Sequence, residues 1–337
     1  MAEWVKAAEL QLELHRWLTS ERGRRWTRGW IEAEIRSEPS KGHMYGLLAA
    51  AEPQKLLTAD SIWVDPEMTE LISIAREDFQ PEIMANEDFL VHTGFCYFAE
   101  PILIHDRNRR VISLGAISWC PIRFTNKTLD EVEAGGLPEL TQDGSEIVSH
   151  DPSLREDLWG IDLTLYTSTV DDRDDYHATH VEARRQLGAP ELLPLHYIPV
   201  VFGEPLDEGH LLDEYGRPTG AEEWWKTVQV TLRLMQQRIV SQEDAHVPRA
   251  TRRRYERAGM YAPSQVCIIR LRRTKPKTGD HEETGRTLTH RHIREGHWRN
   301  QWYPSVQRHR QIRIQRTIVG DDSLPLIVKR RFYRWDR

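Results

Sequence analysis

The segment "FCYFAEPILIHDRNRRVISLGAISW", residues 95–119, decides the class of fold, because the sequence changes here from helical to strand periodicity. Short runs rich in aromatic and β-branched residues are typical of β-strands. Between two such runs stands "DRNR", a polar group suited to a turn. We therefore predict β segments on both sides of a turn at Asp106–Arg109.

The region before this segment has helical periodicity. Residues near one face of a first helix are Trp4, Ala8, Leu14, Trp17 and Leu18, and a second helical segment starts with Trp26, Trp30 and Ile31. In "DPEMTELISIAR", residues 65–76, Asp65 can cap a helix and Pro66 suits its first position. The stripe that this third helix should bury comprises Met68, Leu71, Ile72 and Ala75.

Beyond the segment, "IDLTLYTSTV" (161–170) reads as a further strand, and residues 202–220, rich in Gly and Pro, read as a linker. A long amphipathic helix should then begin near Ala221, since Thr219 and Glu222 have capping-box spacing. Its apolar stripe is Trp224, Val228, Leu232, Met235 and Ile239. A basic helix in "PRATRRRYERAG" (248–259) and several strand-like pieces follow.

This order of elements predicts an α+β fold: a helical N-terminal part, a mixed β centre, and a long amphipathic helix leading into a C-terminal antiparallel sheet. We expect an acidic α+β body at residues 1–220 and a basic, β-rich region at 221–337, either as two domains or as one intertwined domain. The chain of 337 residues is long enough for roughly two domains.

Composition restricts the classes of function. The 39% hydrophobic content, with 12 tryptophans, can build a core. No apolar run approaches the roughly 18 residues of a membrane span, and the N-terminus lacks the apolar core of a signal peptide. Cys96, Cys120 and Cys267 are too few and too scattered for a disulfide framework. We therefore expect a cytoplasmic protein without a membrane association.

The net charge of −6 hides a strong asymmetry along the chain. Residues 249–337 contain 23 Lys and Arg against 8 Asp and Glu, whereas residues 1–248 contain 23 against 44. Such asymmetry is typical of a polyanion-binding end or of two regions that dock through complementary charge. The sequence does not separate these two interpretations.

The basic end contains the segment "THRHIREGHWRNQWYPSVQRHRQIRIQR", residues 289–316, which has four histidines, seven arginines and two tryptophans. Arginine binds phosphate in a bidentate way, and bases of single strands stack on exposed aromatic rings. We therefore predict an RNA- or single-stranded-DNA-binding surface. Its predicted residues are Arg294, Trp298, Arg299, Trp302, Arg310 and Arg313.

The main alternative is a metal-independent RNase or other nuclease. Histidines that titrate near neutrality can act as general base and general acid, and arginines can stabilise the charge on phosphate. His290, His292 and His297 would be the catalytic residues of such an enzyme. The stretch contains the necessary groups but no specific catalytic motif, since many RNA-binding surfaces share its composition.

We expect no cofactor and no metal. The pair His290-x-His292 has a chelating spacing, but the surrounding arginines oppose cation binding. A separate, acidic segment, "DDRDDYHATH" (171–180), has better metal ligands in Asp174, Asp175, His177 and His180. Acidic runs of this kind are usually solvated loops or helix caps.

A further alternative is a protein–protein interaction module, such as an antitoxin or an inhibitor, with an acidic protein partner. Arg, Trp and Tyr are enriched at interface hot spots, so the basic end fits this class as well. The salt dependence of oligonucleotide binding separates the two classes, because phosphate contacts predict a steep linear loss of log affinity with log salt.

Four C-terminal segments carry a resemblance to other proteins: "RRRYERAG", "VCIIRLRR", "HIREGHWRNQWYPS" and "HRQIRI". They resemble segments in a group of uncharacterised proteins of actinobacteria and their phages and mobile elements, mainly over about residues 224–330. The resemblance is weaker near residues 94–120. It implies a mobile-element setting and does not identify a chemistry.

Overall fold

The computed structural model divides the chain into two compact units. Unit 1 comprises Met1–Gln236 and Val240–Leu271, and unit 2 comprises Gln237–Ile239 and Arg272–Arg337. The division lies at Leu271, so the helix that begins at Ala221 belongs to the first unit. The residues that the structure describes are 2–37, 39–106, 108–126, 145–149, 158–204, 221–237, 240–271, 291–294, 297–303, 308–314, 317–319 and 326–327.

A mixed β-sheet forms the centre of unit 1. The strands described there are β1 (Asp60–Val64), β2 (Gly94–His105), β3 (Val111–Asn126), β4 (Ser145–Ser149), β5 (Leu158–Ser168), β6 (Leu192–Val201), β7 (Val240–His246) and β8 (Gln265–Leu271). Their order is β6-β5-β3-β2-β1-β8-β7, and β4 pairs with β3 outside this path. Strand β1 runs parallel to both β2 and β8, whereas β2, β3, β5 and β6 form antiparallel neighbours.

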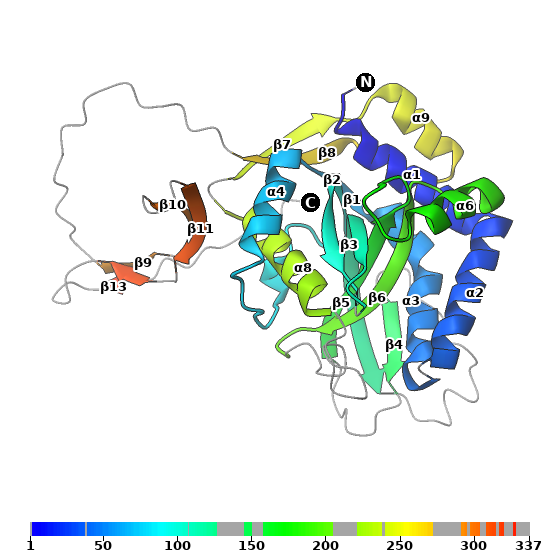
Figure 1. Ribbon diagram of the computed structural model, residues 1–337, viewed down its shortest axis with the longest axis horizontal. Helices are drawn as coiled ribbons and strands as arrows, with labels where there is room; N and C mark the ends of the chain where they lie inside the picture. Colours follow the sequence, from blue (N-terminus) through cyan, green and yellow to red (C-terminus); the bar gives the residue numbers. More distant parts are fainter. Residues whose placement is uncertain are drawn as a thin grey trace. The chain divides into compact units, whose positions relative to one another are not determined.

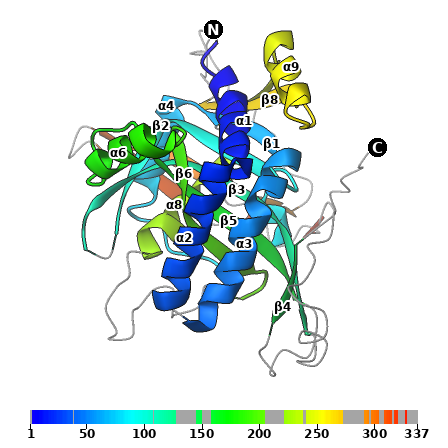
Figure 2. The same ribbon diagram turned by 90° about the vertical axis from the view of Figure 1, so that its right-hand side faces the viewer.

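Helices cover both faces of this sheet (Figure 1). The helices are α1 (Val5–Thr19), α2 (Glu21–Ser37), α3 (Pro39–Thr58), α4 (Pro66–Ala75), α6 (His177–Leu187), α8 (Ala221–Met235) and α9 (Arg249–Arg257). Helices α1 and α3 contact the sheet on the face seen in Figure 2, and α4 packs beside α8 on the opposite face. The α+β class predicted from the sequence is therefore confirmed.

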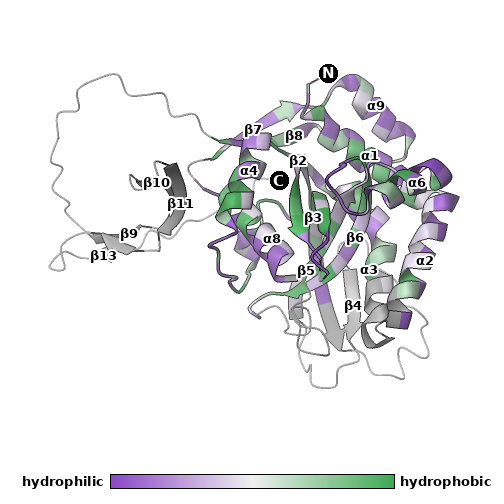
Figure 3. Ribbon diagram, in the orientation of Figure 1, coloured by the Kyte–Doolittle hydropathy of each residue, from purple (hydrophilic) through white to green (hydrophobic). Residues whose placement is uncertain are grey.

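The core lies between these layers, and the sheet is its most apolar part (Figure 3). One cluster of buried side chains includes Leu14 and Trp17 of α1, Trp63 of β1, Phe95 of β2 and Tyr166 of β5. Phe95 and Tyr166 meet edge to face, with ring centroids 5.8 Å apart. Aromatic residues of this size supply much of the apolar area that such a core removes from water.

The predicted turn at Asp106–Arg109 joins β2 to β3. The Asp106 carboxylate accepts hydrogen bonds from the backbone N–H groups of Asn108 and Arg110, at 2.8 and 2.9 Å. Arg109 adopts a positive φ of 61°. The flanking β segments are confirmed as two long strands, and the register of the hairpin shifts between Tyr97 and Ile102, around Pro101, which has no N–H for the ladder.

Three predicted helices are confirmed, and the boundary signals of α4 and α9 are confirmed with them. Asp65 caps α4 by accepting from the Glu67 N–H at 3.0 Å. In α8 the described members of the predicted stripe are buried, whereas Thr219 and Ile239 lie outside the described residues. Helix α9 ends at Arg257, and Gly259 follows it with a φ of 71°, as expected of a C-terminal glycine.

Strand β8, which the sequence placed among the C-terminal strands, belongs to the central sheet of unit 1. It pairs with β7 on one side and with β1 on the other, and it places Ile268 opposite Trp63. Burial explains this position, because Val266, Ile268 and Ile269 are buried and thus need a covered place in the central sheet.

Unit 2 contains short strands: β9 (Arg291–Arg294), β10 (His297–Tyr303), β11 (Arg308–Ile314), β12 (Thr317–Val319) and β13 (Leu326–Ile327). Strands β10 and β11 form an antiparallel pair. Strand β9 lies between β12, antiparallel to it, and β13, parallel to it. The predicted C-terminal β structure is therefore present as a two-stranded and a three-stranded sheet.

Candidate functional site

The described site residues predicted from the sequence lie on three strands of unit 2. His290 lies outside the described residues. Strand β9 carries His292 and Arg294, β10 carries His297, Trp298, Arg299 and Trp302, and β11 carries Arg310 and Arg313.

The strand register brings some of these positions together and separates others. Residue 298 pairs with residue 313, so a predicted stacking residue, Trp298, stands opposite a predicted phosphate-binding residue, Arg313. Arg310 pairs with Gln301 on the same two strands. His292 and His297 belong to different sheets. The three-histidine cluster and the RNA-binding surface on these strands stay predictions.

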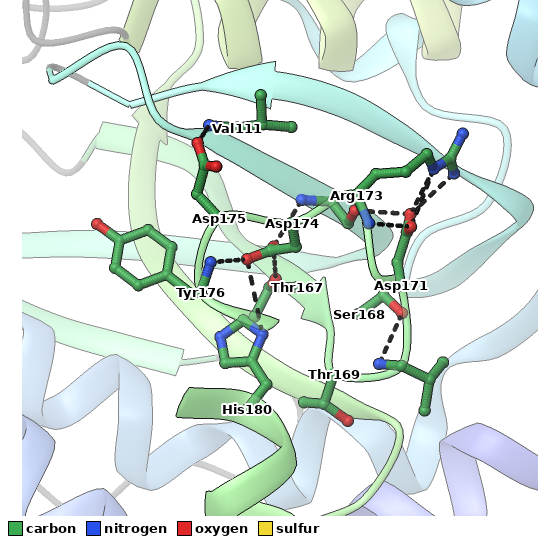
Figure 4. A network of polar contacts seen from close by, with 12 residues as sticks. Val111, Thr167, Ser168, Thr169, Asp171, Arg173, Asp174, Asp175, Tyr176 and His180 are labelled. Atoms are coloured by element: carbon green, nitrogen blue, oxygen red, sulfur yellow. Dashed lines mark hydrogen bonds and ion pairs between the residues drawn. The ribbon is translucent and has the colours of Figure 1, made fainter. Parts of the chain in front are cut away.

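The acidic segment 171–180 forms a network of polar contacts at the start of β3 (Figure 4). The carboxylate of Asp174 is buried and accepts hydrogen bonds from the N–H of Ser113 at 2.8 Å and of Tyr176 at 2.6 Å. The Thr167 hydroxyl donates to it as well, at 3.2 Å. Asp175 accepts from the Val111 N–H at 2.5 Å. These carboxylates therefore hold the segment against the edge of the β2–β3 hairpin.

Two histidines of this segment lie beside Asp174 without completing a metal site. His180 Nδ1 is 3.8 Å from Asp174 Oδ1, and burial lowers the pKa of His180 although Asp174 raises it. The Nδ1 atom of His177 is buried and has no hydrogen-bond partner in the described part of the chain. No group of three His, Cys, Asp or Glu side chains among the described residues is placed to hold a metal ion.

Asp171 anchors the start of the same segment. Its carboxylate accepts from the Ser113 hydroxyl at 2.7 Å and from the Arg173 guanidinium at 2.8 and 2.9 Å. Burial acts to raise the pKa of Asp171, but the hydrogen bonds from Arg173 and Ser113 outweigh it and lower the pKa to about 2. Asp171 is therefore ionised at neutral pH, and its contacts tie the start of the segment to Ser113 of β3.

Helix α9 presents a row of arginines on a buried anchor. Thr251 and Tyr255 are buried, and the Tyr255 hydroxyl donates a hydrogen bond to the Ala8 carbonyl of α1. The exposed residues of the helix are five arginines (Arg249, Arg252, Arg253, Arg254 and Arg257) together with Ala250 and Glu256. Spacing of this kind on a short helix leaves one apolar stripe for the body and turns the remaining circumference to solvent.

Most of these arginines have no carboxylate partner. Arg254 forms an ion pair with Glu9, with Nη1 2.9 Å from Oε1. Arg249, Arg252, Arg253 and Arg257 make no ion pair and no side-chain hydrogen bond with any residue that the structure describes. Their guanidinium groups keep all their donors for a bound anion.

The arginine row continues onto α1. Arg16 near the end of that helix donates from Nη2 to the Arg254 carbonyl at 2.7 Å, which fixes its head group beside α9. Helix α2 begins two residues after α1 ends and carries exposed arginines in its first turns, namely Arg22, Arg24, Arg25 and Arg28. Figure 3 shows α9 and α2 among the most hydrophilic elements of unit 1.

An open hollow of about 590 Å³ lies along α1 next to Arg254. The residues of α1 that line it follow one another at intervals of three and four, so they lie on one face of the helix. The lining residues from α1 and the residue after it are Lys6, Glu9, Leu10, Glu13, Arg16, Trp17 and Ser20, and Glu191 and Arg254 complete the hollow.

A buried charged cluster under α3 was not predicted from the sequence. Lys55 Nζ lies 2.7 Å from Glu52 Oε2, 2.9 Å from Asp162 Oδ2 and 2.6 Å from the Thr164 hydroxyl. The hydroxyl groups of Thr164 and Tyr166 also donate to Glu52. The signal was Glu52-x-x-Lys55 within an otherwise apolar stretch, a spacing that places both residues on one helix face.

The charges of this cluster depend on one another. Burial by itself disfavours the Lys55 ammonium, but Asp162 and Glu52 outweigh it and raise its pKa. Burial and Glu52 raise the pKa of Asp162 to about 6, although Lys55 lowers it. All three side chains are almost fully buried, so the cluster is a structural element rather than a site open to a substrate.

Comparison with known proteins gives little further information. No model of a protein family and no curated protein sequence matches the chain. Among solved structures, the chain is similar to that described as the crystal structure of AcrVA2, with a TM-score of 0.33 and 12% sequence identity. The match covers 87% of this chain and 83% of that chain. A similarity this low supports no conclusion about fold or function.

None of the described helices is both long and apolar enough to cross a membrane.

Proposed function

We propose that this chain is a cytoplasmic nucleic-acid-binding protein that holds the phosphate backbone of RNA or single-stranded DNA on the arginine face of α9. The proposal extends the predicted surface of the C-terminal strands to a second, described surface in unit 1. The resemblance of the C-terminal segments adds a phage or mobile-element setting to the proposal. The observation that carries the proposal is the row of four exposed α9 arginines without carboxylate partners.

Unpaired, exposed guanidinium groups are suited to phosphate for two reasons. Each presents a planar fork of donors that matches two phosphate oxygens. Each also displaces a condensed counterion when it neutralises a phosphate, which favours binding at low salt. A helix anchored by Tyr255 presents several such groups at fixed spacing, so a single strand can contact them successively.

The same face also fits an acidic protein partner, and oligonucleotide titrations discriminate between the two classes. We would measure the affinity of the full chain for labelled 15-residue RNA and DNA strands by fluorescence anisotropy at several KCl concentrations. The proposal predicts a linear decrease of log affinity with log salt. Gels of the same samples would show whether the strands stay intact, which tests the nuclease alternative.

Single substitutions assign the binding to α9. Arg252→Ala and Arg253→Ala should each weaken binding to all sequences similarly and reduce the salt slope by about 1. The matched control is Arg109→Gly, which also removes one exposed arginine, at a positive φ that glycine tolerates. If Arg253→Ala and Arg109→Gly weaken binding equally, the loss reflects the net charge of the protein and does not place the binding site on α9. If no oligonucleotide binds, the result favours the acidic protein partner.

A further inference from the structure

Tyr261 stands beyond the C-terminal end of α9 as an exposed aromatic residue. It lies four residues after Arg257, the last residue of the helix, and is 84% exposed. The other large apolar residues that are exposed in the described structure are 45–59% exposed. Tyr261 makes no hydrogen bond, ion pair or ring contact with any residue that the structure describes. A single exposed apolar residue is ordinary on a protein surface, so what distinguishes Tyr261 is the way the backbone holds it next to the arginines of α9.

A Schellman motif fixes the backbone immediately before Tyr261. The N–H of Gly259 donates to the Glu256 carbonyl at 3.1 Å. The N–H of Met260 donates to the Tyr255 carbonyl, also at 3.1 Å. Gly259 has the positive φ of 71° that this motif requires. Met260 is 4% exposed and belongs to the same buried cluster as Tyr255, so the chain is anchored in the core one residue before the exposed ring.

The backbone after Tyr261 is fixed as well. The Ser264 carbonyl accepts a hydrogen bond from the N–H of Val247 at 3.0 Å, and Val247 stands two positions before the first residue of α9. The adjacent pair, Gln265 with His246, belongs to the ladder of β7 and β8. Helix α9 and Tyr261 thus lie in one closed connection between two neighbouring strands (Figure 1). The fold therefore sets the place of Tyr261 before a ligand binds, which lowers the entropy cost of binding.

An exposed ring next to unpaired arginines matches the two parts of a single nucleic-acid strand. Arg253 and Arg257 are four residues apart on α9, so they lie on one face of the helix and present their guanidinium groups to phosphates. The ring of a tyrosine offers a flat surface on which any base can stack. In a duplex each base is already stacked between its neighbours, so its face is open to a protein ring only in a single strand or after the base has left the stack.

We propose that Tyr261 stacks on an unpaired base of the strand whose phosphates α9 binds, and that this contact makes the arginine face selective for single strands over duplex. The inference rests on the proposed function, because the arginines supply the affinity and Tyr261 supplies the selection. Tyrosine and arginine are also enriched at protein interfaces. The four α9 arginines without a described carboxylate partner favour a polyanion with regularly spaced charges, such as a nucleic-acid strand.

The first test measures the affinity of the full chain for a labelled 15-residue single strand and for the duplex of the same sequence, by fluorescence anisotropy at fixed salt. Tyr261→Ala should weaken binding of the single strand by roughly 5-fold or more, as the loss of one stacking ring typically does. The affinity for the duplex and the salt slope should stay unchanged, because no phosphate contact is lost. Tyr261→Phe should bind the single strand as tightly as the natural sequence does, since it keeps the ring.

A matched control and a spectroscopic readout place the contact at Tyr261. Trp159→Ala removes another exposed aromatic residue, 59% exposed on β5, and should leave the affinity for both nucleic acids unchanged. All these variants should keep the melting temperature, because the replaced residues are exposed. Strands that carry 2-aminopurine at successive positions report stacking, because a stacked ring quenches the fluorescence of this base. At one position the strand should fluoresce less in the complex with the natural sequence than in the complex with Tyr261→Ala.

The outcomes separate this inference from the proposed function. Salt-dependent binding that does not distinguish single strand from duplex, or that Tyr261→Ala leaves undiminished, overturns the stacking contact and keeps α9 as a phosphate-binding face. An equal loss of affinity in Tyr261→Phe and Tyr261→Ala assigns the contact to the hydroxyl group and overturns stacking as well. If no strand binds, both proposals are overturned, and a labelled polyglutamate peptide then tests the acidic protein partner.

Discussion

Replacing Lys55 by methionine should destabilise the protein strongly, because it leaves two buried carboxylates without their cation. Lys55 Nζ is within 3 Å of Glu52 and Asp162, and the side chains of all three residues are 0–1% exposed. Removing one partner of a buried ionic group typically costs about 3–5 kcal/mol. That is a large part of the roughly 5–15 kcal/mol by which native proteins are stable.

Urea denaturation followed by tryptophan fluorescence measures this loss. With a denaturant slope of about 3 kcal/mol/M, Lys55→Met should lower the midpoint by roughly 1–2 M. The control is Arg25→Met, which removes a cation of similar length from an exposed pair with Glu21, where the side chains are 80% and 87% exposed. We expect the control to leave the midpoint unchanged, since exposed ion pairs contribute little.

The pH dependence follows from the raised pKa of Asp162. Its folded pKa of about 6 lies above the value of about 3.9 of an unfolded aspartate, so the folded state binds the proton more tightly. Its contribution to stability is thus complete below pH 4 and is lost as the pH rises through 6. Without Lys55 the Asp162 carboxyl favours protonation still more, because the cation that lowers its pKa is gone. The destabilisation by Lys55→Met should therefore be larger at pH 8 than at pH 5.

One result would refute this reasoning: an unchanged midpoint of Lys55→Met at pH 8. A second check uses the triple variant Lys55→Met/Glu52→Gln/Asp162→Asn. It removes all the buried charges together and should recover part of the lost stability, because no unpaired ion remains. A triple variant less stable than Lys55→Met would contradict the interpretation of the cluster as a set of mutually compensating charges.

Three further predictions concern unit 1. Asp171→Asn should reduce the loss of stability on acidification. The lowered pKa of Asp171 gives stability that is present above about pH 4 and is lost as the pH falls toward 2. Thermal melts at pH 2.5 and 7 measure the difference. Gly23→Ala should lower the melting temperature, because a Cβ there would lie 1.9 Å from the Trp17 carbonyl oxygen at the junction of α1 and α2; an unchanged melting temperature would contradict that packing. Tyr255→Phe removes the hydrogen bond to the Ala8 carbonyl and should lower the free energy of unfolding by about 1 kcal/mol. Amide hydrogen exchange should become faster in α9 alone. If exchange in α9 is unchanged by the substitution, another contact holds the helix.

Local signals in the sequence predicted the elements that depend on local physics. Asp65 and Pro66 mark the start of α4, and the turn after His105 follows from its polar residues. The helical periods of α1, α8 and α9 were visible in the spacing of their large apolar residues. The structure buries most of α1 and α8, and in α9 it buries Thr251 and Tyr255.

Strand β1 was not predicted, since it is short and follows a helix without an intervening turn signal. Its parallel partner β8 is about 200 residues away along the chain, and no local pattern records such a pairing. The sequence placed β8 with the C-terminal strands for the same reason, because its pairing with β1 has no local signal.

The candidate site shows the same division between local and long-range information. The basic character of α9 is visible in the sequence, but which of its arginines pair with a described carboxylate is a property of the fold. Glu9 and Glu13 lie about 240 residues before α9 and share its surroundings only after α1 and α9 have packed together. The two charges that surround Lys55 illustrate this too: Glu52 is local, whereas Asp162 comes from β5.

The pairing of β1 with β8 also has a consequence for how the protein is made. Ile62 needs Cys267 as its neighbour, so β1 keeps one edge of unpaired N–H and C=O groups until the ribosome has released residues beyond 267. At about 5–20 residues per second, that interval lasts roughly 10–40 seconds. An open edge of this kind is a template for pairing with other chains. The nascent chain therefore passes through a stage in which β1 needs protection from aggregation, and truncation before β8 would make that stage permanent.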